Sequence, residues 1–108
     1  MSPKRKELPP IHKNLNIGDI FYYDNNGPEP VKIVGFTQKR VKTSPIGTTT
    51  IECDPSGGSC KINVNDQPNG KIYDIGKYNE TYDELTISGK SYFRLKPKHY
   101  DDIFYYYY

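Results

Sequence analysis

Two cysteines, Cys53 and Cys60, are the residues of this chain whose spacing most directly suggests covalent chemistry. They are the only cysteines in the sequence, and they enclose residues 54–59, which are rich in Gly and Ser. This composition predicts a six-residue hairpin loop, and cysteines that face one another across a hairpin have a Cβ separation suited to a disulfide. Closing so short a ring would stabilise the fold by about 2–3 kcal/mol. Since cytosolic thiols stay reduced, two free thiols are the alternative, and a disulfide would indicate a location outside the cytosol.

Metal, cofactor and catalytic chemistry have little support in the sequence. A zinc site would need His12 and His99 to join two cysteines whose spacing exceeds the usual interval of roughly two to four residues. The acidic pairs at 83–84 and 101–102 have no adjacent His or Lys that would form an acid–base pair with them, which predicts solvated ends of strands. No Gly-rich phosphate loop precedes a helix, and no nucleophile has a strand–turn–helix setting. We therefore expect no enzyme, no metal site and no cofactor.

Basic residues form a possible contact surface for nucleic acid. Lys39, Arg40 and Lys42 cluster after a predicted strand, and residues 92–98 place Tyr and Phe beside Arg and Lys. Aromatic platforms in a basic groove are typical of proteins that bind single strands. The net charge of +2 is too small to indicate nucleic acid by itself. Lysines on the solvent face of a strand are the more common origin of such a pattern, so nucleic acid ranks below protein as the expected partner.

The chain ends in an aromatic run, and its residues are the candidate partner-binding group: Phe104, Tyr105, Tyr106, Tyr107 and Tyr108. Tyrosine has high β-propensity, and its ring combines a broad apolar body with a polar tip. An uncovered run of such rings would promote aggregation. We expect an extended segment that pairs with a sheet edge, its own or a neighbour's. Tyr105 and Tyr107 would lie on one face, and Tyr106 and Tyr108 on the other.

Short strands are the elements that would position all of these residues. Alanine, the best helix former, is absent from the chain. Strands are predicted where apolar residues lie between turn residues, at 20–23, 31–36, 48–53, 60–64, 71–75, 85–87, 90–95 and 102–108. Ser88 and Gly89 predict a tight hairpin. We expect an all-β fold, a small single-domain barrel or sandwich of roughly six to eight short antiparallel strands.

The opening of the ordered region follows a family pattern. Gly18 and Asp19 precede the strand at 20–23, a turn follows, and Val31-Lys32-Ile33-Val34 begins the next strand. Residues 16–36 thereby resemble the first part of small SH3-like β-barrels of the Tudor and KOW type. The resemblance implies a small barrel and a binding module that contacts nucleic acid or a peptide. The segment 43–70 is longer than the connections usual in such barrels.

The organisation of the chain indicates a body with two tails. We expect residues 1–16 to form an extended, Pro-rich basic arm, residues 17–98 a small all-β domain, and residues 99–108 a Tyr-rich terminal strand or tail. No apolar run is long enough for a membrane span. No apolar stretch follows the basic residues 4–6, so we expect no secretory signal.

Composition and tails together predict a structural role. Ile, Lys, Asn and Tyr are abundant while Ala is absent, a bias that AT-rich codons would produce. This composition resembles that of small structural proteins of AT-rich large DNA viruses. We expect a non-enzymatic interaction protein, a minor capsid protein or another virion component, that docks to the other proteins of a multi-subunit assembly through its arms. Its location would be the virion. The alternative is a cytoplasmic SH3-, Tudor- or KOW-like binding module.

Overall fold

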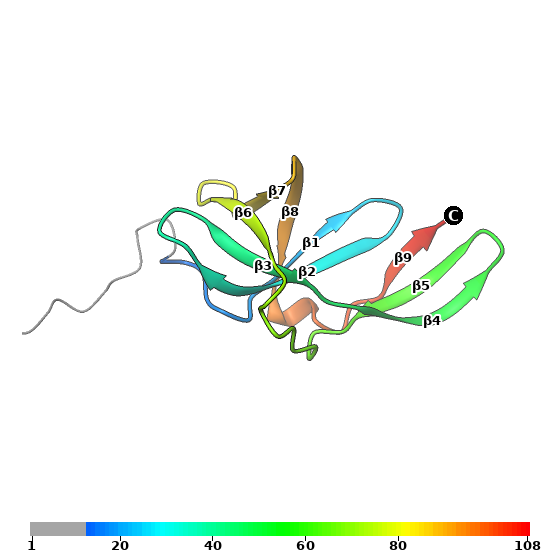
Figure 1. Ribbon diagram of the computed structural model, residues 1–108. Helices are drawn as coiled ribbons and strands as arrows, with labels where there is room; N and C mark the ends of the chain where they lie inside the picture. The colour runs from blue at the N-terminus through cyan, green and yellow to red at the C-terminus, as the bar shows by residue number, and fades with distance from the viewer. Residues whose placement is uncertain (1–12) are drawn as a thin grey trace, which may run out of the picture.

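The protein is built from two antiparallel sheets. In the computed structural model, which describes residues 13–108, six strands form a closed barrel and three form a smaller sheet (Figure 1). The barrel contains β1 (Ile20–Asp24), β2 (Pro28–Phe36), β3 (Val41–Pro45), β6 (Asp74–Asn79), β7 (Glu84–Ile87) and β8 (Lys90–Leu95). The smaller sheet contains β4 (Thr48–Asp54), β5 (Gly57–Ile62) and β9 (Phe104–Tyr107). The predicted all-β class is confirmed, and residues 13–108 include no helix long and apolar enough to cross a membrane.

The barrel is a meander that closes on itself. Each strand pairs antiparallel with its neighbour, β3 pairs with β6, and β8 returns to pair with β1. Closure leaves no free barrel edge. This architecture is compatible with an SH3-like barrel, as the resemblance of residues 16–36 predicts.

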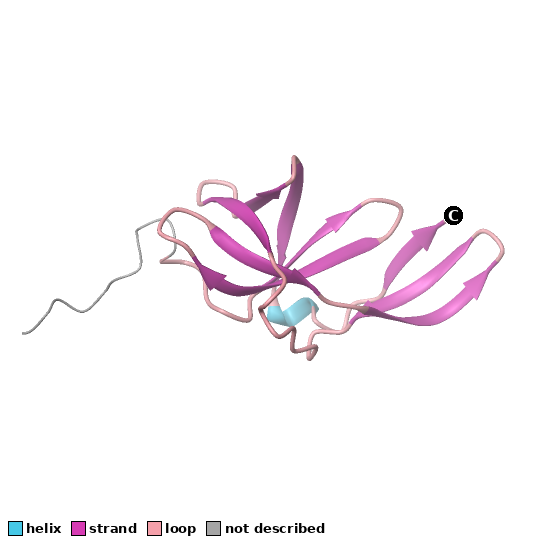
Figure 2. Ribbon diagram, in the orientation of Figure 1, coloured by secondary structure: helices cyan, strands magenta, loops and turns pink. Residues whose placement is uncertain are grey.

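The long segment after β3 is an insertion that supplies β4 and β5, two of the three strands of the smaller sheet. β3 and β6 are neighbours in the barrel, yet the chain leaves after β3 to form the β4–β5 hairpin before it returns. A 3-10 helix (Pro97–His99) then leads the chain from β8 towards β9, which adds to β5 (Figure 2). The unusual length of 43–70 therefore reflects a separate element and not an enlarged barrel loop.

Local sequence explains some strands better than others. The predicted β7–β8 hairpin is present, with positive φ angles of 50° at Ser88 and 79° at Gly89, as a two-residue primed turn requires. The strand β3 was not predicted because Lys42, Ser44 and Pro45 interrupt its apolar pattern. Pairing with both β2 and β6 defines it instead. The strand β6 begins at Asp74, three residues later than the predicted start at residue 71.

Two apolar clusters hold the architecture together. One fills the barrel and consists of Leu15, Phe21, Val31, Ile33, Val41, Tyr78, Leu85, Ile87 and Tyr92. The other, made of Ile20, Ile46, Ile62 and Leu95, lies where the smaller sheet joins the barrel. Its partly buried neighbours include Tyr22 and Phe104, whose rings meet edge to face at 5.1 Å. The second cluster positions the smaller sheet against the barrel.

A buried lysine secures the chain between the two sheets. The side chain of Lys32, on β2, donates hydrogen bonds to the carbonyl oxygens of Val64 at 2.8 Å and Asp66 at 2.6 Å. Lys32 is only 7% exposed, and a buried ammonium group needs such acceptors. It thereby attaches the loop after β5 to the barrel wall.

Candidate functional site

The hairpin that carries the cysteines differs from its predicted form. A two-residue turn of Pro55 and Ser56 replaces the expected six-residue loop. One carboxylate oxygen of Asp54 accepts hydrogen bonds from the backbone N–H groups of Ser56 and Gly57, at 2.8 and 3.2 Å, which stabilises this tight turn. Gly57 has a φ of 155°, and a Cβ atom there would collide with the carbonyl oxygen of Tyr106.

The cysteines consequently do not face one another. Cys53 pairs with Gly58 and Cys60 with Thr50, and both thiols are free. Cys53 is exposed, whereas Cys60 is 3% exposed and its burial raises the pKa of its thiol. The expectation that these residues lie opposite each other was wrong because the turn is shorter and a bulge occurs between Thr50 and Glu52. The structure thus has the alternative arrangement, two free thiols.

The C-terminal tyrosines form a strand on the edge of the chain's own sheet. Tyr105 pairs with Ser59, Tyr106 with Gly58 and Tyr107 with Gly57. The N–H of Tyr107 also donates to the carbonyl oxygen of Asn26 at 2.9 Å. The prediction of an extended, sheet-pairing segment is confirmed, and it is the protein's own β5 that covers one side of it.

Alternate residues of β9 have different environments, as the strand period predicts. Phe104 and Tyr106 are half-buried, and Tyr106 packs so closely that a Cβ atom at Gly58 would lie 2.6 Å from its hydroxyl oxygen. Gly27, in the β1–β2 turn, allows a similar approach, since a Cβ there would lie 2.6 Å from the Cβ of Tyr106. The inner face of β9 is therefore anchored by contacts that require glycine.

The opposite face of β9 is open. Tyr105 is 63% exposed and Tyr107 is 65% exposed. They border a hollow of about 350 Å³ whose lining also includes Glu52 and Ser59. We call the surface formed by the exposed residues Glu52, Tyr105 and Tyr107 the tyrosine face; Ser59, which pairs with Tyr105, is itself buried. Beside it, β4 is the outer strand of the sheet and every one of its residues is exposed.

The three predicted nucleic-acid contacts lie at the barrel and away from the tyrosine face. Lys39 and Arg40 are exposed in the turn between β2 and β3, and Lys42 is on β3. The N–H of Arg40 donates to the hydroxyl of Thr37 at 2.8 Å, which defines the turn. The Nζ of Lys42 lies 4.8 Å from the centre of the Tyr73 ring, an aromatic neighbour that sequence reasoning did not identify.

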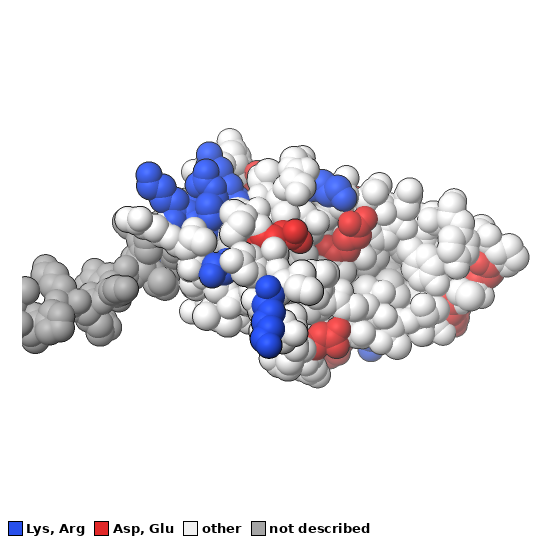
Figure 3. Space-filling model, viewed as in Figure 1, with Lys and Arg blue, Asp and Glu red and all other residues white. Residues whose placement is uncertain are grey.

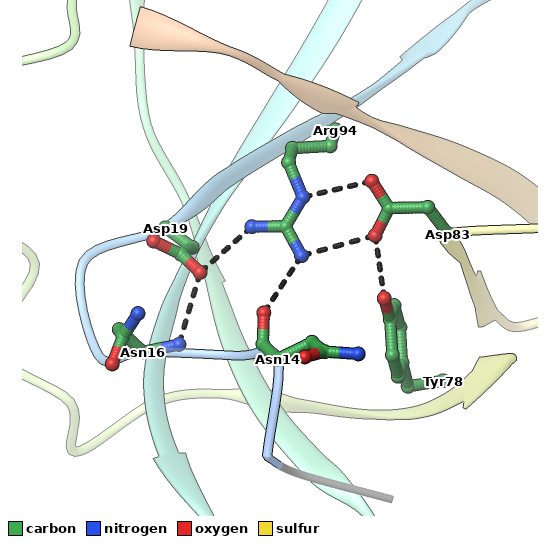
Figure 4. Close-up of polar contacts among 6 residues, drawn as sticks. All are labelled: Asn14, Asn16, Asp19, Tyr78, Asp83 and Arg94. Carbon is green, nitrogen blue, oxygen red and sulfur yellow. Dashed lines mark hydrogen bonds and ion pairs between the residues drawn. The ribbon is translucent and has the colours of Figure 1, made fainter. Parts of the chain in front are cut away.

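The most connected polar cluster belongs to the barrel itself (Figure 4). The guanidinium of Arg94 donates to both carboxylate oxygens of Asp83, at 2.8 and 3.0 Å, and to Asp19 at 2.9 Å. It also donates to the carbonyl oxygen of Asn14 at 3.0 Å, while the Tyr78 hydroxyl donates to Asp83. These contacts join the segment before β1 to β6, β8 and the turn before β7.

The electrostatics of this cluster are those of a structural ion pair. Hydrogen bonds from Arg94 hold the pKa of Asp83 below its ordinary value, and Asp83 raises the pKa of Arg94 in return. Burial raises the pKa of Tyr78. The prediction that Asp83 is solvated is met only in part, because its side chain is 39% exposed and is also paired with Arg94. Arg94 is accordingly engaged inside the cluster, although the sequence suggested a nucleic-acid contact.

The remaining titratable residues offer little further chemistry. Within residues 13–108, no three His, Cys, Asp or Glu side chains are placed to hold a metal ion. His99 pairs with Asp102 at 2.8 Å on the surface. His12 lies outside the described residues, as does most of the predicted N-terminal arm.

Comparisons of this chain with protein-family models, with curated proteins and with solved structures found no match. Its own structure therefore defines its class. It is a small all-β protein with a closed six-strand antiparallel barrel and an appended three-stranded sheet.

Proposed function

We propose that this protein is a non-enzymatic interaction protein that docks to neighbouring proteins through the tyrosine face. The observation that carries the proposal is the exposure of Tyr105 and Tyr107 on a strand whose other face is anchored. Tyrosine is enriched at the energetic centres of protein interfaces. A ring held on an ordered strand also loses little conformational freedom when a partner covers it.

Burial of the two exposed rings would contribute substantially to the free energy of binding. Full burial of a ring of this size removes apolar surface worth about 1.5–3 kcal/mol before ordering costs are subtracted. Covering both Tyr105 and Tyr107 would supply several kcal/mol, which is a large part of a micromolar affinity of about 8 kcal/mol.

The exposed strand β4 adds a second element to the same docking surface. A partner strand could extend the sheet by hydrogen bonding to its outer edge. Non-specific pairing of other chains with this edge would be limited by the charges of Glu52 and Asp54 and by the bulge after Thr50. Charges and bulges commonly protect edge strands in this way.

The assembly that we propose is a multi-subunit particle, with the protein as a minor capsid protein or other virion component of a large DNA virus. This part of the proposal is supported by the composition of the chain. Mass spectrometry of purified particles would test it, because a structural component is present in fixed stoichiometry and a contaminant is not.

A finer classification of the barrel as a Tudor- or KOW-type module is a further proposal. It is supported by the turn before β1, where Gly18 has a φ of 99° and the N–H of Asp19 donates to the carbonyl oxygen of Asn16.

Photo-crosslinking tests the docking surface directly. Benzoylphenylalanine would replace Tyr105, Tyr107 or, as a control, Tyr82, which is 70% exposed in the turn between β6 and β7. In the native source, positions 105 and 107 should crosslink to the same protein, and position 82 should not. The double variant Tyr105→Ser/Tyr107→Ser should then bind the purified partner at least tenfold more weakly, with Tyr82→Ser unchanged. Identical crosslinks at all three positions would refute the proposal.

A further inference from the structure

The outer wall of the barrel carries a row of basic and aromatic side chains on β3 and β6. Val41 and Thr43 are fully buried inside the barrel, so Lys42 between them points outward. On β6, Gly76 and Tyr78 are buried, and Ile75 and Lys77 are exposed.

Strand pairing brings these residues together. Val41 is paired with Gly76 and Lys42 with Ile75. Continuing this register by one residue places Arg40 opposite Lys77. Tyr73 precedes β6, and the Lys42 ammonium group lies over its ring. The residue Tyr73 is 40% exposed. We call the surface formed by Lys39, Arg40, Lys42, Tyr73, Ile75 and Lys77 the basic stripe.

Among residues 13–108, no carboxylate forms an ion pair with the cations of the basic stripe. Across residues 13–108, the ion pairs of Lys and Arg involve Lys13, Lys90 and Arg94. Lys39, Arg40, Lys42 and Lys77 are in none of them. Asp74 begins β6 and is exposed beside Tyr73, but the positions of β3 and β6 that share a face with Lys42, Ile75 and Lys77 carry no Asp or Glu. Adjacent unpaired cations repel each other, so the surface favours an anionic ligand.

The molecular surface shows how these charges are distributed. In the view of Figure 3, most Lys and Arg side chains lie over the barrel, with some Asp and Glu among them, while the outer part of the three-stranded sheet shows Asp and Glu. The tyrosine face and the basic stripe therefore lie on different sheets and differ in charge. A ligand of the basic stripe need not compete with a protein on the tyrosine face.

We propose that the basic stripe binds single-stranded nucleic acid. Lysine and arginine side chains would contact phosphates, and the exposed ring of Tyr73 with the neighbouring Ile75 would contact a base. Single-strand binders combine such charges with stacking platforms, and each base–aromatic stack contributes about 1–3 kcal/mol. An acidic protein is the alternative occupant of this surface, and the oligonucleotide titration below distinguishes the two.

Salt-dependent binding of a labelled oligonucleotide tests the proposal. The full-length chain would be titrated into fluorescein-labelled oligothymidine and oligouridine of about 12 nucleotides, with anisotropy measured between about 50 and 200 mM salt. The variant Lys42→Gln/Lys77→Gln should bind at least tenfold more weakly. Its salt slope should fall by about 0.7 for each cation removed. Lys61→Gln, on the three-stranded sheet, is the matched control and should change neither quantity.

Two further variants separate the possible sources of binding. Tyr73→Leu should weaken binding several-fold without changing the salt slope, because it removes stacking and no charge. Lys4→Gln/Arg5→Gln/Lys6→Gln should retain most of the affinity if the basic stripe is the site. Circular dichroism and urea midpoints would verify that each variant is folded.

The proposed site would be refuted if the protein bound no oligonucleotide at the lowest salt. It would also be refuted if only the variant at residues 4–6 lost binding. Equal binding of heparin with no effect of Tyr73→Leu would show a general anion surface instead. Tyr105→Ser/Tyr107→Ser should bind the oligonucleotide normally, so the outcome is independent of the proposed docking function.

Discussion

Replacing Arg94 by methionine should cost this protein more stability than any other loss of a single exposed or half-exposed charge. Arg94 donates four hydrogen bonds, to Asp83, Asp19 and Asn14, and its guanidinium lies 5.0 Å from the Phe21 ring centre. Methionine would retain much of the apolar contact but would leave two carboxylates without their cation.

The magnitude follows from burial. Breaking a fully buried ion pair costs about 3–5 kcal/mol. Here the side chains of Asp19 and Asp83 are 24% and 39% exposed, so solvent screens part of the loss. We expect Arg94→Met to lower the free energy of unfolding by about 2–4 kcal/mol, which for a domain of this size lowers Tm by about 10–20 °C. The stability of Arg94→Lys should lie between those of the wild type and Arg94→Met, because lysine keeps the charge but loses the paired contact with Asp83.

Urea unfolding followed by tyrosine fluorescence would measure this loss, since the chain has 11 Tyr and no Trp. Arg40→Met is the matched control, because Arg40 is exposed and forms no ion pair with any carboxylate of residues 13–108. It should change stability by less than about 0.5 kcal/mol. A loss of the same small size for Arg94→Met would refute the reasoning. So would additive effects in a double-mutant cycle with Asp83→Asn, because paired residues are coupled.

The pH dependence of stability gives an independent check of the same ion pair. Arg94 lowers the pKa of Asp83 in the folded state, from an ordinary value of 3.8. The resulting stabilisation is present above the unfolded pKa and is lost as the pH falls through the lower folded pKa. Wild-type stability should therefore decline below about pH 4, and Asp83→Asn should show a smaller decline. If the stability of Asp83→Asn declines at acid pH as much as that of the wild type, Asp83 is not the group responsible.

Three other expectations concern the cysteines, the terminal strand and the buried lysine. In the native, unreduced protein, Cys53 should alkylate rapidly and Cys60 slowly; resistance of both until a reductant is added would indicate a disulfide. Deleting residues 104–108 should leave a barrel that unfolds cooperatively but about 1–3 kcal/mol less stable, because half-buried Phe104 is lost; an unfolded product by circular dichroism would contradict this. Lys32→Met should speed hydrogen exchange in residues 63–72 more than Lys61→Met does, and equal exchange would show that its hydrogen bonds do not hold that loop.

Sequence reasoning succeeded where a local pattern determines the structure. The all-β class follows from the absence of Ala and the abundance of aromatic and β-branched residues. The β7–β8 hairpin follows from Ser88 and Gly89, a turn-forming pair in which Gly89 adopts a positive φ angle without steric cost. The alternation of Tyr105 and Tyr107 with Tyr106 follows from the two-residue period of a strand. Each of these depends on neighbours in the chain.

The sequence could not reveal features that depend on distant contacts. The pairing of β3 with both β2 and β6 compensates for its polar pattern, so local propensity missed it. The partners of Arg94 lie 11 and 75 residues away in the chain, and no local motif links them. The same holds for Lys77, which only the barrel register places beside Arg40.

The sequence by itself determined that this protein is a chain of short strands with basic and tyrosine-rich segments, because strand propensity and turn chemistry are local. Tertiary structure decided the rest. The tight turn at Pro55 and Ser56 set a register in which the two cysteines are not opposite each other. Separately, Gly57 and Gly58 allow Tyr106 to pack against the hairpin. The barrel closes without β9, so β9 adds to the edge of the smaller sheet, where Phe104 and Tyr106 are half-buried and Tyr105 and Tyr107 are exposed. Which rings face solvent depends on which surfaces pack, and packing is a property of the whole fold.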